Sequence, residues 1–317
     1  MLHQITIENF RCFPHLNVEL RPLTVLIGPN NTGKSAFLAA CQCLHNDTKI
    51  ELTDHWRFNE TVALKIRASG DKSSNYSVTH VLDKNRRKQM ERGEILKGIS
   101  LIRLPSTGIA CRDQGFPTSE TSLPLGENGE HVASVLDYML RKDRRRFDGV
   151  VSSLRTLVPG FEDLVIDTPN PQTRHLKVIA DNGLQLPGEL LSVGMRHMIF
   201  FATLGYHPSA PDVVLVEEPE LGVHPKRLGD ILSLLRSLSK GEFSDQPAQV
   251  ILTTHSPFLL DHIDLGQDQL LIFQRDDDCD GARTAQPADQ ERLDVFLDEF
   301  MLGEVWLNEG EKGLVRQ

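Results

Sequence analysis

The chain has 317 residues, of which 39% are hydrophobic and 25% are charged, and its formal net charge is −10. These values are typical of a folded globular protein with a sizeable core, and they exclude a disordered or fibrous chain. The acidic balance also excludes a surface that is basic all over and coats nucleic acid, although local basic patches remain compatible with it.

The sequence contains no sign of export or of membrane insertion. The longest nearly unbroken apolar run, Met198–Ala202, is far shorter than the roughly 20 residues that cross a bilayer. The start of the chain has no basic region followed by a long apolar stretch, so no signal peptide is expected. Five cysteines without metal-type spacing are typical of free thiols in a reducing compartment. We therefore expect a cytoplasmic protein with no membrane partner.

The first half of the chain is predicted to contain mostly strands. Alternating or continuous apolar runs predict them at residues 2–7, 16–20, 23–27, 61–68 and 76–82. The last two are expected to form a small antiparallel sheet beside the main one. Good helix formers from Ser35 to Ala40 predict a helix directly after the buried strand Leu23–Ile27 and a short glycine-containing loop.

The second half is predicted to alternate strands and helices. Residues 105–130 are rich in Pro, Gly, Ser and Thr and predict a loop, and 131–157 predict a helical segment. Strands are predicted at 165–166, 176–180, 213–216, 249–253 and 269–273, and helices at 193–205 and 225–239. Asp181-Asn182-Gly183 predicts a hairpin turn. Apolar strands that alternate with helices favour a largely parallel, covered sheet.

The loop between strand 23–27 and its helix has the sequence Gly28-Pro29-Asn30-Asn31-Thr32-Gly33-Lys34-Ser35, which fits a phosphate-binding loop in both pattern and context. Its backbone N–H groups and the helix N-terminus would face the α and β phosphates of a nucleotide. Lys34 is expected to reach the β and γ phosphates. The Ser35 hydroxyl is expected to ligate Mg²⁺, which prefers oxygen donors. The sequence therefore predicts ATP binding.

Two adjacent carboxylates, Glu217 and Glu218, follow the apolar run Val213–Val216. Such a strand holds them rigidly at its carboxyl end, where ligands bind in open α/β sheets. Glu217 is then placed to hold Mg²⁺, and Glu218 to polarise the attacking water. An alternative without chemistry, in which acidic residues merely end a strand, is less compatible with the phosphate-binding loop upstream.

Two weaker signals come from Ser192, Gly194 and His255. Ser192 and Gly194 stand at a predicted helix start, where Ser192 also serves as an ordinary N-cap. His255 follows the predicted strand 249–253, and a lone histidine is more often a surface or core residue than a catalytic one. The order of these segments along the chain, however, favours a functional role for them.

The order of phosphate loop, Ser-x-Gly helix start, acidic strand and histidine resembles that of ABC-type ATPases. Matching residues include Ile5-x-Ile7-x-Asn9-Phe10-Arg11-Cys12-Phe13, Asn30-Asn31, Glu217-Glu218-Pro219-Glu220 with His224-Pro225, and Thr254-His255-Ser256-Pro257. The chain resembles the RecF/SMC-like branch, in particular the small AAA-type (AAA_21-like) ATPases related to the OLD family.

The resemblance implies a homodimeric head in which ATP lies between two subunits. Residues Gly28–Ala36 and Arg11 of one subunit would bind the nucleotide and face Ser192 and Gly194 of the other, while His255 would sense the γ phosphate. Relatives act in DNA repair or phage defence, often with a fused or separately encoded nuclease. OLD-family nucleases carry a Toprim domain after the ATPase, and with 62 residues after His255 none is expected here.

The sequence departs from the family pattern at several points. Val193 and Met195 replace the glycine and glutamine of many transporters, and Glu217 stands where many relatives have Asp. No glutamine loop is assigned, because Gln89 and Gln114 both lack a convincing context.

Two basic runs, at residues 84–88 and 141–146, are candidates for DNA contact, although a solvated face is the commoner role of such runs. The apolar residues near the C-terminus favour core packing over a partner surface. They are Phe296, Phe300, Leu302, Val305 and Trp306.

We therefore predict an α/β P-loop ATPase head with a mostly parallel core sheet, an antiparallel β subdomain and an inserted helical segment. A single domain of residues 1–317 is expected, with an N-terminal lobe at 1–125, the helical insert at 126–160 and a C-terminal lobe at 161–317. The predicted function is Mg²⁺-dependent ATP hydrolysis that acts with DNA or with a separate effector protein. The alternatives are a transporter nucleotide-binding subunit and an ATP-dependent switch that does not hydrolyse ATP.

Overall fold

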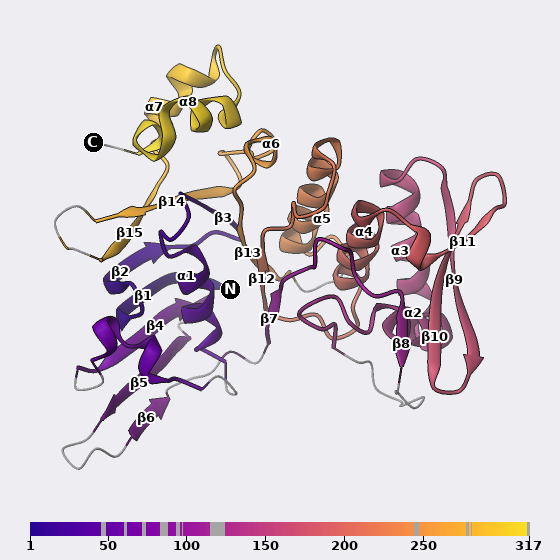
Figure 1. Ribbon diagram of the computed structural model, residues 1–317, viewed down its shortest axis with the longest axis horizontal. Helices are drawn as coiled ribbons and strands as arrows, with labels where there is room; N and C mark the ends of the chain where they lie inside the picture. The colour runs from indigo at the N-terminus through magenta and orange to yellow at the C-terminus, as the bar shows by residue number, and fades with distance from the viewer. Residues whose placement is uncertain are drawn as a thin grey trace. The chain divides into compact units, whose positions relative to one another are not determined.

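A computed structural model of the chain describes residues 1–45, 49–59, 62–71, 74–82, 88–92, 96, 98–114, 124–243, 247–276, 279 and 281–315. The chain forms two compact units that are interleaved along the sequence (Figure 1). The first unit contains Met1–Leu101, Pro211–Glu217 and Ala248–Gln317, and the second contains Ile102–Ala210 and Glu218–Pro247. Within the described ranges, no helix is both long and apolar enough to cross a membrane.

The first unit is built on a six-stranded sheet in the order β15-β14-β3-β13-β12-β7. The strands are β3 (Leu23–Ile27), β7 (Ile99–Ile102), β12 (Val213–Glu217), β13 (Gln249–Thr253), β14 (Gln269–Arg275) and β15 (Arg283–Pro287). β3, β12, β13 and β14 pair in parallel, and β15 is antiparallel to β14. Every residue of β3 and β13 is buried, which explains their continuous apolar runs. The predicted parallel core sheet is confirmed.

A second, antiparallel sheet of the first unit has the order β2-β1-β4-β5-β6. Its strands are β1 (Leu2–Phe10), β2 (Phe13–Glu19), β4 (Leu64–Gly70), β5 (Asn75–Leu82) and β6 (Lys88–Arg92). In β1, the buried Ile5 and Ile7 alternate with polar side chains, and Ile5 lies opposite Val18 of β2. The predicted antiparallel subsheet is therefore present, and it also includes the first two strands of the chain.

One hydrophobic core joins the two sheets with helix α1 (Lys34–Gln42). Phe273 of β14 is fully buried and contacts the rings of Phe13 and Phe37 edge-on, with centroids 6.3 and 5.6 Å away. These three rings come from the main sheet, the antiparallel sheet and α1. Cys41 and Cys43 are buried in the same core, and all five cysteines are free thiols.

The first unit also contains the helices α6 (Pro257–Leu260), α7 (Gln290–Leu297) and α8 (Leu302–Leu314). Ser256 caps α6 and Asp289 caps α7 through their side chains. Neither α7 nor α8 was expected from the apolar pattern of the sequence.

The second unit combines helices with a small antiparallel sheet. Its helices are α2 (Val132–Lys142), α3 (Arg144–Leu157), α4 (Val193–Gly205) and α5 (Leu228–Lys240), and its strands are β8 (Arg112–Gln114), β9 (Phe161–Asn170), β10 (Thr173–Ala180) and β11 (Gln185–Pro187). The predicted helical segment is thus two helices, which part at Asp143, whose carboxylate caps α3. The predicted hairpin turn joins β10 to β11.

Two sequence-based expectations are modified by these elements. The region 105–130, predicted as a loop, contains the short strand β8, whose polar residues show no apolar alternation and which forms by pairing with β10. The two interleaved units also divide the chain differently from the contiguous lobes 1–125, 126–160 and 161–317. A single ATPase domain with those lobes stays a prediction.

Replacing Phe273 with Ala should lower the free energy of unfolding of the first unit by about 3–5 kcal/mol, because the cavity would remove ring contacts to Phe13 and Phe37. Urea unfolding followed by circular dichroism measures this loss. Val295→Ala is the matched control, since its side chain is 73% exposed and its effect should stay within about 0.5 kcal/mol. Equal losses in both variants would contradict this view of the core.

Candidate nucleotide-binding site

The predicted phosphate-binding loop lies between β3 and α1, and its geometry requires glycine at two positions. Gly28 has a φ of +150°, and a Cβ atom there would lie 2.2 Å from the carbonyl oxygen of Phe273. Gly33 has a φ of +101°, and its Cβ atom would lie 2.7 Å from the ring of Phe13. The loop therefore packs directly against the aromatic core, which fixes the position of the loop relative to the sheet.

Two side chains of the loop donate hydrogen bonds to carbonyl groups of the loop itself. Asn31 adopts a left-handed conformation with a φ of +62°, and the Thr32 hydroxyl donates to the carbonyl of Pro29 at 2.8 Å. Lys34 is buried, and its ammonium donates to the carbonyls of Gly28 and Pro29 at 2.7 and 2.9 Å. The N-cap of α1 is Gly33, which provides no side-chain cap for the first-turn N–H groups. This arrangement suits a phosphate group.

Ser35 and Glu217 lie in direct contact, although they are 182 positions apart in the sequence. The Ser35 hydroxyl, at the start of α1, donates to a carboxylate oxygen of Glu217, at the end of β12. A hydroxyl and a carboxylate side by side form the set of hard oxygen donors that Mg²⁺ accepts. The predicted pair of metal-ligating residues is therefore brought together, and these residues fit the ion.

Glu218, the predicted catalytic carboxylate, follows directly after Glu217 and opens the second unit. It has a positive φ of +48°, which is uncommon for a residue other than glycine. The turn after it is closed by backbone bonds from Leu221 to Glu218 and from Val223 to Glu220, at 3.1 and 3.0 Å. The chain therefore changes direction sharply at the point where water activation is expected.

His255 is exposed just beyond β13, at the same edge of the sheet as the phosphate-binding loop. The N–H of Thr254 donates to the carbonyl of Leu26 in β3 at 3.1 Å, which ties the histidine loop to the strand that enters the phosphate-binding loop. Ser256 caps α6 directly afterwards. The position of His255 therefore agrees with the prediction, whereas its role as a γ-phosphate sensor stays a prediction.

Arg11 lies in the turn between β1 and β2, with a left-handed φ of +46°. Its N–H and its Nε atom donate to the carbonyl and the carboxylate of Asp54, at 2.7 and 2.9 Å. Cys12, the next residue, lies beside Gly33 of the phosphate-binding loop. Arg11 is thus held close to the loop by Asp54. Ala36, the other predicted nucleotide-binding residue, lies in the first turn of α1. Contact of either residue with nucleotide stays a prediction.

Sequence reasoning missed Arg283, which braces the phosphate-binding loop from β15. Its Nε atom donates to the carbonyl of Asn31 at 2.7 Å, and its backbone N–H donates to the carbonyl of Cys12 at 2.9 Å. Arg283 therefore holds the left-handed turn of the loop and adds a permanent positive charge beside it. It lies 252 positions from Asn31, in a short polar segment without a motif, so no local signal could have indicated it.

The predicted Ser-x-Gly segment belongs to the second unit. Ser192 is exposed and caps α4, because its Oγ accepts from the N–H of Met195 at 3.2 Å. Gly194 has no positive φ, and the nearest atom to a Cβ placed there is 3.6 Å away, on Val223. An alanine would fit at this position, so the fold of one chain does not require glycine at residue 194.

The start of α4 is anchored to the segment 105–109. The guanidinium of Arg196 donates to the carbonyls of Thr107 and Ile109 at 2.6 and 3.2 Å. His197 is fully buried and lies 3.3 Å from the carbonyl of Pro105. Burial lowers the pKa of His197 to about 4, so this side chain is neutral at physiological pH. Ser192 is therefore exposed at the start of a helix that these contacts hold in place.

The arginine-rich run of α2 and α3 is largely neutralised within the chain. Arg144 pairs with Asp148 at 2.8 Å, and Arg146 pairs with Asp143 at 2.9 Å. Among the described residues, Lys142 and Arg145 form no ion pair. Of the other basic run, residues 84–87 lie outside the described residues, as does the side chain of Lys88. The side chains of Gln89 and Gln114, considered for a glutamine loop, also lie outside the description.

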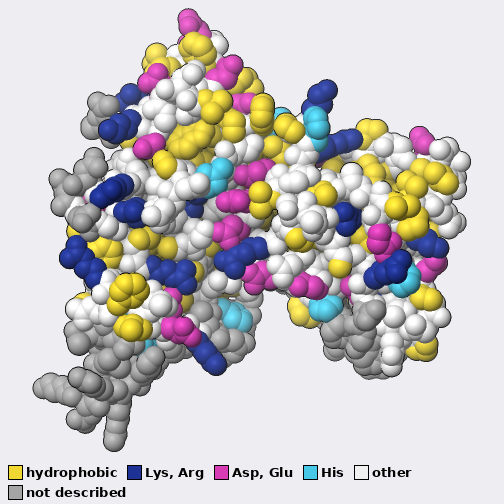
Figure 2. All heavy atoms as spheres, in the orientation of Figure 1, with side chains coloured by type: hydrophobic (Ala, Val, Ile, Leu, Met, Phe, Trp, Pro, Cys, Tyr) yellow, Lys and Arg dark blue, Asp and Glu magenta, His cyan; other side chains and the backbone are white. Residues whose placement is uncertain are grey.

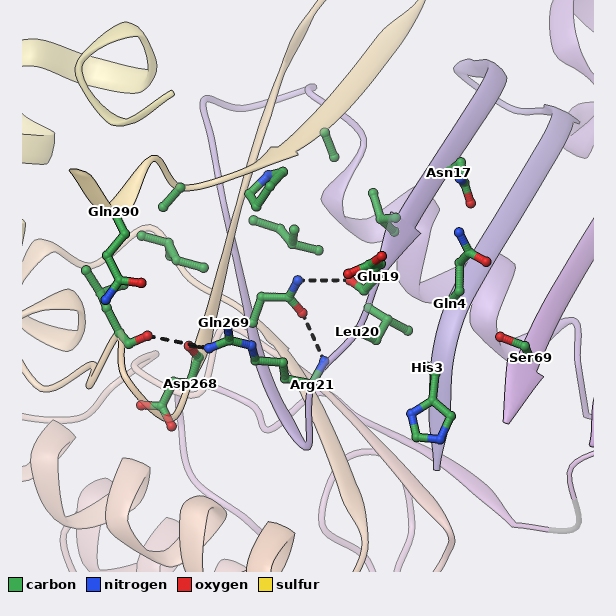
Figure 3. Close-up of a pocket in the computed structure, with 17 residues that line it drawn as sticks. His3, Gln4, Asn17, Glu19, Leu20, Arg21, Ser69, Asp268, Gln269 and Gln290 are labelled. Carbon is green, nitrogen blue, oxygen red and sulfur yellow. Dashed lines mark hydrogen bonds between the residues drawn. The ribbon is translucent and has the colours of Figure 1, made fainter. Parts of the chain in front are cut away.

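A polar cavity of about 730 Å³ lies at the opposite edge of the main sheet (Figure 3). Arg21 precedes β3 there, and its backbone N–H donates to the side chain of Gln269, which in turn donates to the carbonyl of Glu19. These residues stand where the parallel strands begin, whereas the phosphate-binding loop, Glu217 and His255 stand where they end. The cavity is therefore separate from the nucleotide-binding edge.

The chain is similar to several known proteins. The family described as "AAA domain, putative AbiEii toxin, Type IV TA system" matches residues 23–261. An OLD nuclease from Thermus scotoductus (strain ATCC 700910 / SA-01) is 22% identical over 363 residues, which cover 96% of this chain and 68% of the relative.

Solved structures of SMC heads share the fold. The SMC head domain from Thermotoga maritima is 14% identical with a TM-score of 0.56, over 91% of this chain and 99% of that one. An SMC head bound to the C-terminal winged-helix domain of ScpA is 13% identical with a TM-score of 0.63, over 92% and 99%. The predicted ABC-type head fold and its relation to the OLD family are confirmed.

Arg283→Gln should weaken ATP binding about tenfold, because it removes a charge-assisted hydrogen bond to the loop and a cation beside the phosphates. Titration with a fluorescent ATP analogue measures the dissociation constant. Arg275→Gln is the control, because Arg275 lies opposite Arg283 on β14 and carries the same charge. An unchanged affinity in Arg283→Gln, or an equal loss in both variants, would refute the bracing role.

Proposed function

Because the chain belongs to the AAA_21 family of AAA domains, we propose that it binds ATP with Mg²⁺, hydrolyses the nucleotide and dimerises around it. The observation that carries this proposal is the contact between Ser35 and Glu217 at the start of α1, directly beside the phosphate-binding loop and Lys34. The oxygen donors of this pair stand next to the lysine in the first turn of α1, whose first N–H groups have no side-chain cap, as suits nucleotide hydrolysis.

Each residue has a defined task in this proposal. The loop Gly28–Ser35 binds the phosphates with its N–H groups, and Lys34 exchanges its carbonyl partners for phosphate oxygens. Ser35 and Glu217 would hold Mg²⁺, which would lower the charge repulsion between phosphate and nucleophile. Glu218 accepts a hydrogen bond from the attacking water and orients it, and His255 donates a hydrogen bond toward the γ phosphate. Catalysis is thus mostly a matter of positioning.

A second copy of the chain completes the site in this proposal. Ser192 is exposed at the start of α4, and Gly194 beside it is not needed by the fold of one chain. Gly194 itself is buried, so its part in the shared site follows from the resemblance to ABC-type ATPases and not from exposure. Ser192 and Gly194 would therefore face the γ phosphate held by the other subunit, with the N-terminus of α4 contributing positive dipole.

The relatives support a role with DNA or with a separate effector protein in the cytoplasm. One relative is named a nuclease, one solved head is bound to a domain of another protein, and the family description refers to a toxin–antitoxin system. We propose that ATP turnover controls such an effector in DNA repair or phage defence. The alternative of a transporter subunit is not favoured by the relatives, and a switch without hydrolysis remains the competing mechanism.

ATP turnover and dimerisation test the proposal together. Lys34→Ala should abolish binding, while Glu218→Gln should reduce turnover about 100-fold or more and accumulate an ATP-bound dimer, because binding survives without water activation. Ser192→Arg should prevent that dimer. Phosphate release and sedimentation velocity with and without ATP measure the two effects. Turnover unchanged in Glu218→Gln would contradict hydrolysis at this site, and the absence of any ATP-dependent dimer would contradict the shared site.

Binding to double-stranded DNA should depend on Lys142 and Arg145, the two cations of the arginine-rich run that form no ion pair with another described residue. Charge reversal at Lys142 and Arg145 should weaken binding and flatten its salt dependence, because fewer counterions are released. The paired residues Arg144 and Arg146 form the matched control, and reversal there should weaken binding less. Fluorescence anisotropy at several salt concentrations measures both. Equal binding by both variants and the wild type would exclude this run as the DNA contact.

A further inference from the structure

The C-terminal helices of the first unit carry a group of exposed apolar side chains, here called the C-terminal surface. Its members, from α6, α7, α8 and the segment between the last two, are Phe258, Val295, Leu297, Phe300, Met301 and Leu307. Val295 and Leu307 are 73% and 68% exposed. Figure 2 shows hydrophobic side chains gathered over this part of the molecule, with acidic ones around them. Exposed apolar side chains that gather on one face, unlike single scattered ones, are typical of interaction sites.

The helices that carry the surface are firmly attached to the first unit. The N–H of Gly303 donates to the carboxylate of Asp261 at 2.8 Å, and a Cβ atom at Gly303 would lie 2.2 Å from the carbonyl of Pro257. Leu302 and Val305 are buried beneath, as the sequence predicted, whereas Phe300 is 46% exposed. The helices are therefore held by buried residues, while a large part of each exposed side chain is left uncovered.

The surface is surrounded by acidic charge that the chain does not neutralise. Residues 289–312 contain eight acidic and two basic side chains. Asp294, Asp298, Glu299 and Glu309 are exposed, and none of them forms an ion pair with another described residue. Burying apolar area next to these carboxylates with an acidic partner would bring like charges together without compensation.

We propose that the C-terminal surface binds a segment of a separate protein in which apolar side chains are flanked by lysine and arginine. Apolar groups of such a segment would cover Val295, Phe300 and Leu307, while its cations would pair with the acidic rim. DNA does not fit, because its phosphates would face the same carboxylates. A second copy of this chain does not fit either, since it would present an equally acidic surface.

The inference deepens the proposed function, because it assigns a docking site to the effector protein named there. It rests on that function only for the existence of an effector. No residue of the nucleotide site belongs to the surface, so binding at the surface and ATP turnover are measured independently. Loss of one with retention of the other tells which of the two proposals fails.

The test uses a fluorescent synthetic helix of about 18 residues, with leucines at helical spacing on one face and lysines on the other. A scrambled peptide and a leucine–glutamate helix are the comparison probes. Two variants change the surface, Phe300→Ser with Leu307→Ser, and Asp298→Lys with Glu299→Lys. Leu184→Ser and Glu19→Lys are matched exposed changes outside it. Thermal unfolding and ATP turnover confirm that every variant is folded.

The expected result is saturable binding of the leucine–lysine helix that weakens about tenfold or more in both surface variants, weakens with salt, and is unchanged in the two controls. Three results would overturn the proposal. They are binding that ignores the surface variants, equal binding of the leucine–glutamate helix, and absence of saturable binding. Self-association of the wild-type chain that disappears in Phe300→Ser with Leu307→Ser would also overturn it, because a second copy would then be the occupant.

Discussion

The parallel register of four strands in the main sheet is the constraint on which the nucleotide site depends. Glu217 lies opposite Thr253, Thr253 opposite Leu26, and Leu26 opposite Leu271, so one row of residues crosses β12, β13, β3 and β14. Strands β12, β13 and β3 then end at this row or one residue beyond it, whereas β14 continues to Arg275. A slip of one residue would move a strand end by about 3.3 Å and would separate Glu217 from Ser35. Backbone pairing thus sets the spacing of the chemical groups.

The aromatic core converts this register into a fixed position for the phosphate-binding loop. Phe273 contributes its carbonyl at the point where Gly28 passes, and its ring packs on α1, which carries Lys34 and Ser35. The antiparallel sheet adds Phe13 under Gly33. The loop therefore rests on two sheets at once. Arg283 then binds the exposed turn of the loop at Asn31. The loop is therefore restrained both where it contacts the core and at its exposed turn.

Elements were predicted correctly where a local residue pattern reflects a physical requirement of the fold or of the site. The buried strands were predicted from continuous apolar runs, and the phosphate-binding loop from its glycines, its lysine and its place between strand and helix. Arg283 could not be predicted, because its contact with Asn31 depends on the pairing of β15 with β14 and not on neighbouring residues. The same holds for Asp54, which orients Arg11 from a short 3₁₀ segment. Polar contacts between residues that are far apart in the sequence produce no periodic residue pattern from which they could be predicted.

The glycines of the site differ in whether the fold of a single chain requires them. Gly28 and Gly33 are required by the fold, since any side chain there would collide with the core. Gly194 meets no such obstacle, and its backbone would accept alanine. Gly194 is itself buried within the chain, so its missing side chain does not leave an exposed backbone. What a single chain offers to the proposed shared site is therefore the exposed Ser192 and the N-terminus of its anchored helix.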